Sequence, residues 1–191
     1  MTRELVWTGF MTLDGAVDSP GGVAEGHPEG GWVFQTPFDA DAFSLKGDEL
    51  AETTALVFGR RSYEAFAAFW PTSEDHAAYH DLPKYVVSSS IGEESLADGW
   101  GGTTILRSTD DVAQLKQTDG GPIFIHGSAE LARRLGAAGL IDRYNLLIFP
   151  ILLPGAKSLF PETEGGRRSL ELIETAAYAN GVVKTVYRVT S

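Results

Sequence analysis

The fold is decided by Leu56-Val57-Phe58-Gly59-Arg60-Arg61-Ser62-Tyr63-Glu64-Ala65-Phe66 and by Pro122-Ile123-Phe124-Ile125-His126-Gly127-Ser128-Ala129-Glu130-Leu131-Ala132. In each stretch a short apolar run reaches a glycine, and a helical pattern begins immediately after it. Glycine lets the backbone turn tightly and lets another molecule approach closely. Each stretch therefore predicts a buried strand that passes through a glycine directly into a helix.

A helix that starts after such a turn favours one kind of ligand. Its first N–H groups have no partner within the helix, and the helix dipole places partial positive charge there. Both properties suit a phosphate. Two such starts at one edge of a sheet would suit a diphosphate, so the junctions at Gly59 and Gly127 indicate a dinucleotide.

Composition sets the bounds on everything else. The chain has 191 residues, of which 43% are hydrophobic, so it can form one α/β domain with a substantial core, and we expect a single domain over 1–191. The net charge of −11 disfavours nucleic acid and anionic membranes as partners. There is no cysteine, which excludes disulfides and thiolate metal sites. Without a signal sequence or a membrane-spanning apolar run, a cytoplasmic protein is expected.

Strands and helices alternate along most of the chain, and strands alone follow at its end. We expect strands at 4–11, 55–58, 84–87, 103–106, 123–126 and 143–151, and helices at 38–52, 60–69, 110–117 and 129–138. Two last strands, 170–178 and 182–189, flank the hairpin signal Asn180-Gly181. This order predicts an α/β fold of three layers: a mostly parallel twisted sheet, helices on both faces and an antiparallel C-terminal hairpin.

A Gly/Pro-rich loop over 19–31 follows the first strand, and such a long loop in a small domain is usually functional. Asp14 stands before it, where a carboxylate could orient a heterocycle or relay a proton as a catalytic group, or could simply form an Asp-Gly turn. Trp32 and Phe34 could line a flat substrate slot or pack in the core. His76 and His80 have the spacing of a metal pair, but a third ligand is missing, so a surface helix without metal is expected.

The order of the motifs resembles a known family. The motifs are Leu13-Asp14-Gly15, Phe58-Gly59-Arg60-Arg61-Ser62-Tyr63, Val86-Val87-Ser88-Ser89-Ser90, Ile125-His126-Gly127-Ser128 and Pro150-Ile151-Leu152-Leu153-Pro154-Gly155-Ala156-Lys157-Ser158-Leu159-Phe160. Together they are similar to the dihydrofolate reductase-like superfamily, and most similar to the reductase (C-terminal) domain of the bifunctional RibD deaminase-reductases of riboflavin biosynthesis. The similarity covers nearly the whole chain.

The resemblance implies NADPH as the cofactor. It places the diphosphate at Gly59, Arg60, Arg61 and Ser62 and at Gly127, Ser128 and Ala129, and the adenosine 2′-phosphate at Ser88, Ser89 and Ser90. Arg107, just after the next strand, could add positive charge there, and the guanidinium groups favour NADPH over NADH. His126 could face the cofactor, or could be a half-buried histidine with its hydrogen bonds satisfied, which we favour.

The resemblance implies an NADPH-dependent reductase of a small heterocyclic or carbonyl substrate, similar to 5-amino-6-(5-phosphoribosylamino)uracil reductase or dihydrofolate reductase. In dihydrofolate reductases a helix carboxylate protonates the substrate, and Asp39 and Asp41 lie nearest its place here. The alternatives are a non-catalytic NADP(H)-binding protein and an interaction protein without a cofactor. The apolar stretch 146–153 also suggests a homodimer, although burial inside the sheet would explain the same pattern.

Overall fold

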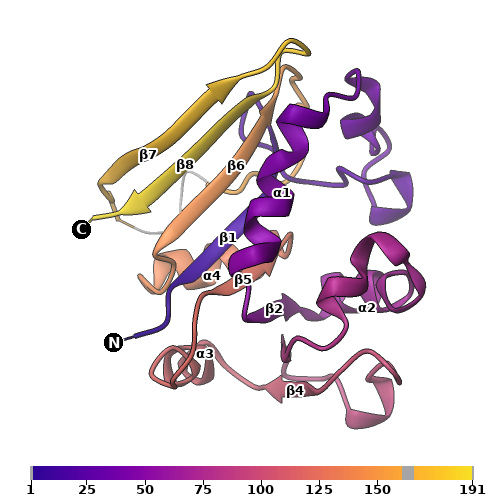
Figure 1. Cartoon of the computed structure of the whole chain (residues 1–191), viewed down its shortest axis with the longest axis vertical. Coiled ribbons are helices and arrows are strands. Elements are labelled where there is room, and N and C mark those ends of the chain that lie inside the picture. The colour runs from indigo at the N-terminus through magenta and orange to yellow at the C-terminus, as the bar shows by residue number, and fades with distance from the viewer. Residues whose placement is uncertain (1, 161–165, 191) are drawn as a thin grey trace.

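A computed structural model describes residues 2–160 and 166–190 of the chain (Figure 1). One eight-stranded sheet has the order β4-β3-β2-β5-β1-β6-β8-β7. Its strands are β1 (Leu5–Thr12), β2 (Ala55–Gly59), β3 (Lys84–Val87), β4 (Thr103–Leu106), β5 (Ile123–His126), β6 (Arg143–Phe149), β7 (Leu170–Ala177) and β8 (Val183–Val189). The first six strands pair in parallel, and β8 pairs antiparallel with β6 and β7. The predicted fold class is therefore confirmed.

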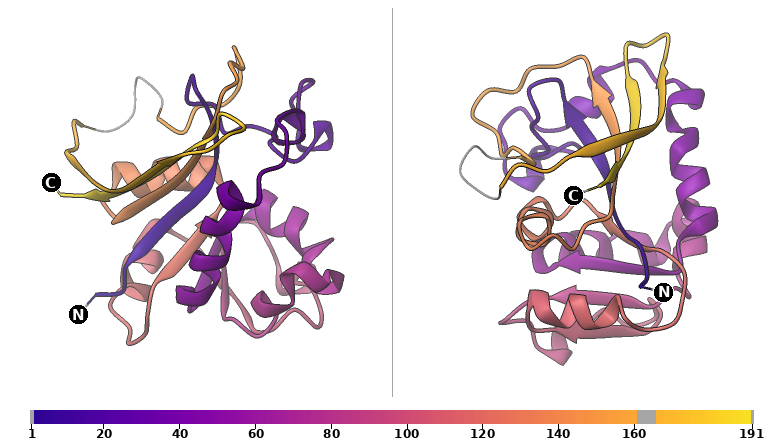
Figure 2. Two further views of the ribbon diagram at one scale, coloured as in Figure 1. Left: turned by 45° about the horizontal axis from the view of Figure 1, so that its top comes forward. Right: turned by 90° about the vertical axis from the view of Figure 1, so that its left-hand side faces the viewer.

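The helices are α1 (Ala40–Glu52), α2 (Arg60–Ala67), α3 (Thr109–Leu115) and α4 (Ala129–Ala137), and they cover both faces of the sheet. Figure 2 shows α1 on one side of the sheet and α4 on the other. The core under α3 and α4 contains Val112 and Leu131, whereas Tyr63 of α2 packs in the core of the opposite face. The sheet thus lies between two helical layers, as a three-layer fold requires.

Local signals explain where the helices begin. The Asp39 carboxylate accepts hydrogen bonds from the backbone N–H groups of Asp41 (3.0 Å) and Ala42 (3.2 Å), which starts α1. Ser108 and Asp111 form a reciprocal capping box at α3. These caps place the start of α1 two residues later, and that of α3 one residue earlier, than we predict from the apolar spacing alone.

The segment after α2 contains the short surface helix that we expect around His76 and His80, with another before it. It forms two short 3-10 helices, Trp70–Thr72 and Glu74–Tyr79, which are joined to the sheet by Lys84. The fully buried Nζ of Lys84 donates hydrogen bonds to three carbonyl oxygens, those of Tyr79 (2.8 Å), His80 (2.9 Å) and Leu82 (3.0 Å). Burial lowers the pKa of Lys84 to about 8. This lysine holds the segment that brings Trp70 and Tyr79 over the sheet.

The apolar stretch that suggests a homodimer lies inside the sheet. Strand β6 pairs with β1 on one side and β8 on the other, and Leu146, Leu147 and Phe149 are buried. Position within the sheet therefore accounts for the hydrophobicity of residues 146–149, whereas Leu152, which follows β6, is 65% exposed. The homodimer stays a prediction. None of the described helices is long and apolar enough to cross a membrane.

Candidate active site

The two strand–glycine–helix junctions lie side by side at the carboxyl edge of the sheet. The backbone N–H of Gly59 donates to Ser128 Oγ at 3.0 Å, and the N–H of Ser128 donates to Ser62 Oγ at 3.0 Å. These bonds join residues that are 69 and 66 positions apart in the chain. The structure thus brings together the residues that we predicted to hold a diphosphate.

The backbone at the second junction is held open toward solvent. Gly127 and Ser128 both have left-handed conformations, with φ of 59° and 53°, and Trp7 Nε1 donates to the Gly127 carbonyl at 2.6 Å. A Cβ added at Gly127 would meet its nearest atom, Ser62 Oγ, only at 3.8 Å. A ligand can therefore approach the Gly127 backbone closely.

The helix starts at the junctions have their first turns free of side-chain caps. Neither Gly59 at α2 nor Ser128 at α4 caps its helix through a side chain, so the first N–H groups of both helices lack a partner from these N-cap residues. Arg60 and Arg61 are exposed, and Arg60 makes only a long ion pair with Glu64 (3.5 Å) in which both side chains are half-exposed. Such a pair is weak and yields readily to a phosphate. The residues present fit a dinucleotide diphosphate.

Ser88, Ser89, Ser90 and Arg107 also meet at this edge. Arg107 Nη1 donates to the carbonyl oxygens of Ser88 (3.0 Å) and Ile91 (2.8 Å), while Ser88 Oγ accepts from the N–H groups of Ser90 (3.2 Å) and Ile91 (3.1 Å). The hydroxyl of Ser88 therefore shapes the turn. The side chains of Ser89, Ser90 and Arg107 are exposed at this turn.

A buried polar centre adjoins the second junction, and sequence reasoning missed most of it. His126, Thr8 and Asn145 form one row across β5, β1 and β6, because Thr8 is in register with both of the others. Glu49 of α1 covers this row and is 1% exposed. Its Oε1 accepts hydrogen bonds from Thr8 Oγ1 (2.6 Å) and Asn145 Nδ2 (2.8 Å).

Lys46, one helical turn before Glu49, completes the polar centre. Its Nζ donates to Glu49 Oε2 at 3.0 Å and to Thr8 Oγ1, and its side chain is 25% exposed. Burial opposes ionisation of Glu49, but the Lys46 charge and the hydrogen bonds from Thr8 and Asn145 outweigh it and hold the Glu49 pKa below its usual value. The centre is therefore an ion pair with its ammonium group nearest the solvent.

His126 is not the satisfied half-buried histidine that we favour from the sequence. It is 9% exposed, and its Nε2 is buried without a hydrogen-bond partner in the described structure. Burial, reinforced by the Lys46 charge, lowers the pKa of His126 to about 3. The rings of Trp70 and Tyr79 contact it edge-on, with centroids at 5.6 and 5.5 Å. His126 is therefore a neutral imidazole enclosed by aromatic rings, with one ring nitrogen unpaired among the described residues.

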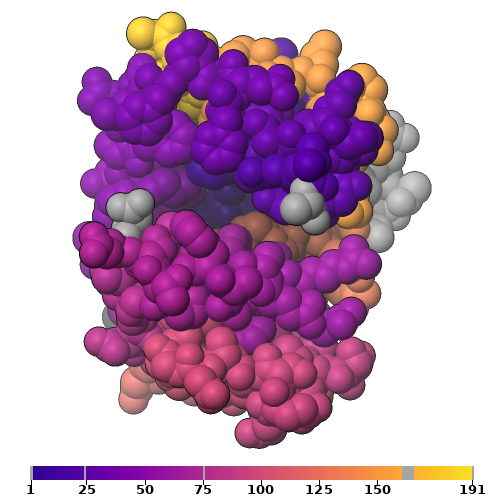
Figure 3. Space-filling view, turned by 90° about the vertical axis from the view of Figure 1, so that its right-hand side faces the viewer, coloured from indigo at the N-terminus to yellow at the C-terminus, as the bar shows by residue number. Residues whose placement is uncertain are grey.

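The molecular surface is hollowed beside these residues. Figure 3 shows a recess between the violet-indigo half of the molecule, which contains α1, and the magenta segment that includes α2 and the two 3-10 helices. The floor has the colours of β1 and of the β5–α4 junction. We refer to this recess as the cleft, and it lies between α1 and the segment that includes α2.

The buried His126 should make stability depend on pH. Its pKa is about 3 in the folded protein against about 6.5 in the unfolded chain, so the unfolded chain binds the extra proton between these values. Stability is therefore complete above pH 6.5 and falls as the pH decreases toward 3. Between pH 7 and pH 5 the loss should be about 2 kcal/mol, measured by urea unfolding.

The variant His126→Gln should lack this component, whereas His27→Gln, which removes a loop histidine, should keep it. Equal pH dependence in wild type and His126→Gln would show that His126 is not buried in its neutral form.

Asp14 lies where a turn uses both of its oxygens. Its Oδ1 accepts from Thr12 Oγ1, and its Oδ2 accepts from the backbone N–H of Leu153 at 2.9 Å. The carboxylate is exposed and ties the end of β1 to the loop after β6. The Asp-Gly turn accounts for these contacts, while the catalytic role stays a prediction.

Trp32 and Phe34 do not form one slot. Trp32 is 1% exposed, with its Nε1 donating to the Asp18 carbonyl at 2.8 Å, whereas Phe34 is 78% exposed. Trp32 packs edge-on against Phe149 with centroids 5.4 Å apart. Trp32 therefore packs in the core, whereas Phe34 lies at the surface.

The other histidines of the cleft wall have structural contacts. His76 Nδ1 lies 2.8 Å from Ser73 Oγ, and His80 Nε2 lies 2.9 Å from the Trp70 carbonyl. His76 also stacks on Trp70, with centroids 4.6 Å apart. Over the described ranges, no three His, Asp or Glu side chains are grouped as metal ligands.

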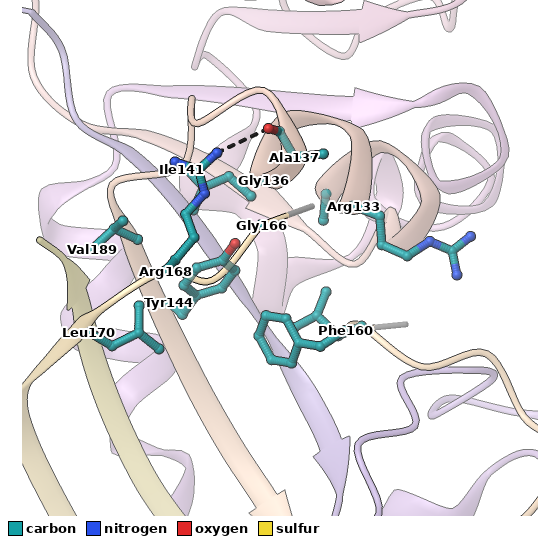
Figure 4. Close-up of a pocket in the computed structure, with 12 residues that line it drawn as sticks. Arg133, Gly136, Ala137, Ile141, Tyr144, Phe160, Gly166, Arg168, Leu170 and Val189 are labelled. Atoms are coloured by element: carbon teal, nitrogen blue, oxygen red, sulfur yellow. Dashed lines mark hydrogen bonds between the residues drawn. The ribbon is translucent and has the colours of Figure 1, made fainter. Parts of the chain in front are cut away.

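A separate cavity of about 260 Å³ lies between α4 and the C-terminal strands (Figure 4). Tyr144, Arg168 and Leu170 line it, and Arg168 Nη2 donates to the Ala137 carbonyl at 3.0 Å. The Arg133 side chain points away from it in Figure 4. None of the predicted site residues lines this cavity, so we place the functional site in the cleft.

Comparisons with known proteins agree with this geometry. The family model of the RibD C-terminal domain matches residues 3–184. The uncharacterized protein YyaP of Bacillus subtilis is 27% identical over 192 residues, which cover 97% of this chain and 94% of YyaP. A provisionally assigned riboflavin biosynthesis protein from Shewanella sp. PV-4 is similar over all of both chains, with a TM-score of 0.73 at 18% identity.

Dihydrofolate reductase from Enterococcus faecalis, solved in complex with NADP(H), is also similar over all of both chains, with a TM-score of 0.61 at 14% identity. The structural likenesses show a shared fold, and the family model covers nearly the whole sequence. The chain belongs to the RibD C-terminal domain family and has the dihydrofolate reductase-like fold.

Proposed function

We propose that this protein is an NADPH-dependent reductase of a small heterocyclic or carbonyl substrate. The observation that carries the proposal is the direct hydrogen bonding of the two junctions, Gly59 to Ser128 and Ser128 to Ser62, beside a cleft with a buried ion pair. One edge of the sheet thereby combines a phosphate-binding surface with groups that can handle a proton.

In this proposal the first turns of α2 and α4, with Arg60 and Arg61, hold the diphosphate. Ser89, Ser90 and Arg107 contact the 2′-phosphate. Two observations support this assignment. The helix starts carry no side-chain caps, and dihydrofolate reductase from Enterococcus faecalis, which has a similar fold, was solved in complex with NADP(H). When bound, NADPH supplies a hydride.

The polar centre then serves the substrate. Reduction of a C=N or C=O group needs a proton on the heteroatom as well as a hydride on carbon. Lys46 is the donor placed for it, because Glu49 and Thr8 occupy two of its three N–H bonds and orient the third.

For the specific reaction, the family resemblance is the guide. The resemblance suggests the uracil reductase step of riboflavin synthesis, and the Shewanella relative is assigned to the same pathway. The competing possibility is an NADP(H)-binding protein without turnover. The Lys46–Glu49 pair favours the reductase, because it holds an ammonium group that is 25% exposed, where it could donate a proton to a substrate.

Replacing Lys46 by methionine should lower kcat/KM about 100-fold, the usual contribution of a positioned proton donor, and leave NADPH affinity unchanged. The assay follows loss of reduced-nicotinamide absorbance with a panel of aminouracils, dihydropteridines and simple carbonyl compounds. Lys157→Met, which removes a lysine that is 53% exposed, is the matched control.

Turnover that survives in Lys46→Met would remove the lysine from the mechanism. Tight NADPH binding by the wild type without turnover of any compound would favour the non-catalytic alternative.

A further inference from the structure

An apolar groove of about 400 Å³ opens at the start of α1. Residues 33–38 form one wall, and Phe43 of α1 and Phe149 of β6 form the other, so no charged side chain lines it. Phe34 and Phe38 at its rim are each 78% exposed. Large aromatic side chains exposed together around a groove mark a binding surface for an apolar ligand.

Phe10 does not line the groove, but its ring lies between two groove residues and the polar centre. This residue follows Thr8 by two positions on β1 and therefore lies on the same face of the sheet. Its ring contacts those of Phe43 and Phe149, with both centroid distances 5.7 Å. Lys46 Nζ lies 5.3 Å from the Phe10 centroid. One ligand could thus contact Lys46 and the groove at once.

The helix sets the span between the two regions. Phe43 and Lys46 are three residues apart and share one side of α1, while Phe38 stacks on Phe43 with centroids 5.4 Å apart. From Lys46 to the first residue of α1 the helix rises about 9 Å. This is the reach of a ring system with a short substituent, rather than of a single small ring.

Charge around the groove argues against a phosphorylated substituent. Asp39 and Asp41 follow within three residues of Phe38, and the Asp39 carboxylate already satisfies N–H groups of the first turn of α1. Lys46 is the cation that these ring contacts bring nearest to the groove, and Glu49 neutralises it. A phosphate here would face carboxylates and aromatic rings.

We propose that the groove binds an uncharged aromatic or apolar arm of the substrate whose reacting head lies at the polar centre. The inference rests on the proposed reductase function and specifies its substrate class. The substrate would then be a heterocycle or carbonyl compound with an apolar arm, in place of the phosphoribosyl substrate that the family resemblance suggests.

The test uses two synthetic diaminouracils that differ only in the arm on the exocyclic amine, phenethyl in one and phosphoethyl in the other. Calorimetry on the NADPH complex should show the phenethyl compound binding at least about tenfold more tightly. In Phe34→Ala/Phe38→Ala this preference should disappear, because both rings are surface groups of the groove. Phe160→Ala, 51% exposed and outside the groove, is the control that should retain it.

A preference for the phosphoethyl compound, or an unchanged preference in the double variant, would overturn the proposal. If neither uracil binds, an uncharged phenylnaphthylamine probe decides. Fluorescence that the double variant abolishes supports an apolar site, and fluorescence that is absent or unchanged overturns it. NADPH titration of the same samples tests the reductase function separately, since the variants leave the junctions intact.

Discussion

Replacing Glu49 with leucine is expected to lower the free energy of unfolding by about 3–5 kcal/mol. The substitution leaves the Lys46 ammonium without its counter-charge, and it removes the acceptor for Thr8 and Asn145. Breaking a buried pair by removing one partner is costly because the other charge stays buried or must move to solvent. Urea unfolding at pH 7 measures the change.

Two further variants separate the buried pair from the helix surface. Glu52→Leu, on the same helix, breaks a pair with Arg143 in which Glu52 is 38% exposed, and it should cost at most about 1 kcal/mol. Lys46→Met/Glu49→Leu should recover part of the stability, since two apolar residues leave no unpaired charge. If Glu49→Leu costs no more than Glu52→Leu, the polar centre is accessible to water and our description of it is wrong.

The fold could be predicted because its signals are local. The junctions at Gly59 and Gly127 can be recognised within a few residues, from an apolar run, a glycine and a helical pattern. The hairpin at Asn180-Gly181 is equally local, and the structure places its turn between β7 and β8. That the two junctions touch follows from the parallel order of the strands, which brings carboxyl ends to one edge.

The polar centre could not be predicted in the same way. Glu49 receives hydrogen bonds from residues 41 and 96 positions away, and only the register of the sheet brings those residues together. One signal was available: Ala42, Leu45 and Glu49 follow the buried stripe of α1, so a glutamate occupies an apolar position. Asp39 and Asp41, the carboxylates suggested by the resemblance, lie instead at the exposed start of the helix.

The burial of Trp32 and the exposure of Phe34 could not be predicted from the sequence either. Trp32 and Phe34 are two positions apart, yet one is buried and the other exposed, because the short 3-10 helix Trp32–Gln35 turns them in different directions. No periodicity in a Gly/Pro-rich loop distinguishes these outcomes. The groove depends on the fold, which places Phe43 and Phe149 beside residues 33–38.

Replacing both arginines of the first junction with alanine is expected to weaken NADPH binding strongly. Arg60 and Arg61 stand exposed at the start of α2, and each charge-assisted hydrogen bond to a phosphate contributes about 1.5–3 kcal/mol. Their joint removal should therefore weaken NADPH binding by about 3 kcal/mol or more, roughly 100-fold. Arg134→Ala/Arg188→Ala removes two exposed arginines from surface pairs and should leave binding unchanged.

Calorimetric titration of the wild type and Arg60→Ala/Arg61→Ala with NADPH and with NADH tests the central claim most directly. We predict micromolar binding of NADPH by the wild type, weaker binding of NADH, and a loss of roughly 100-fold in the variant. If the wild type binds neither nucleotide, the junctions serve only the fold, and the assignment of a reductase is contradicted.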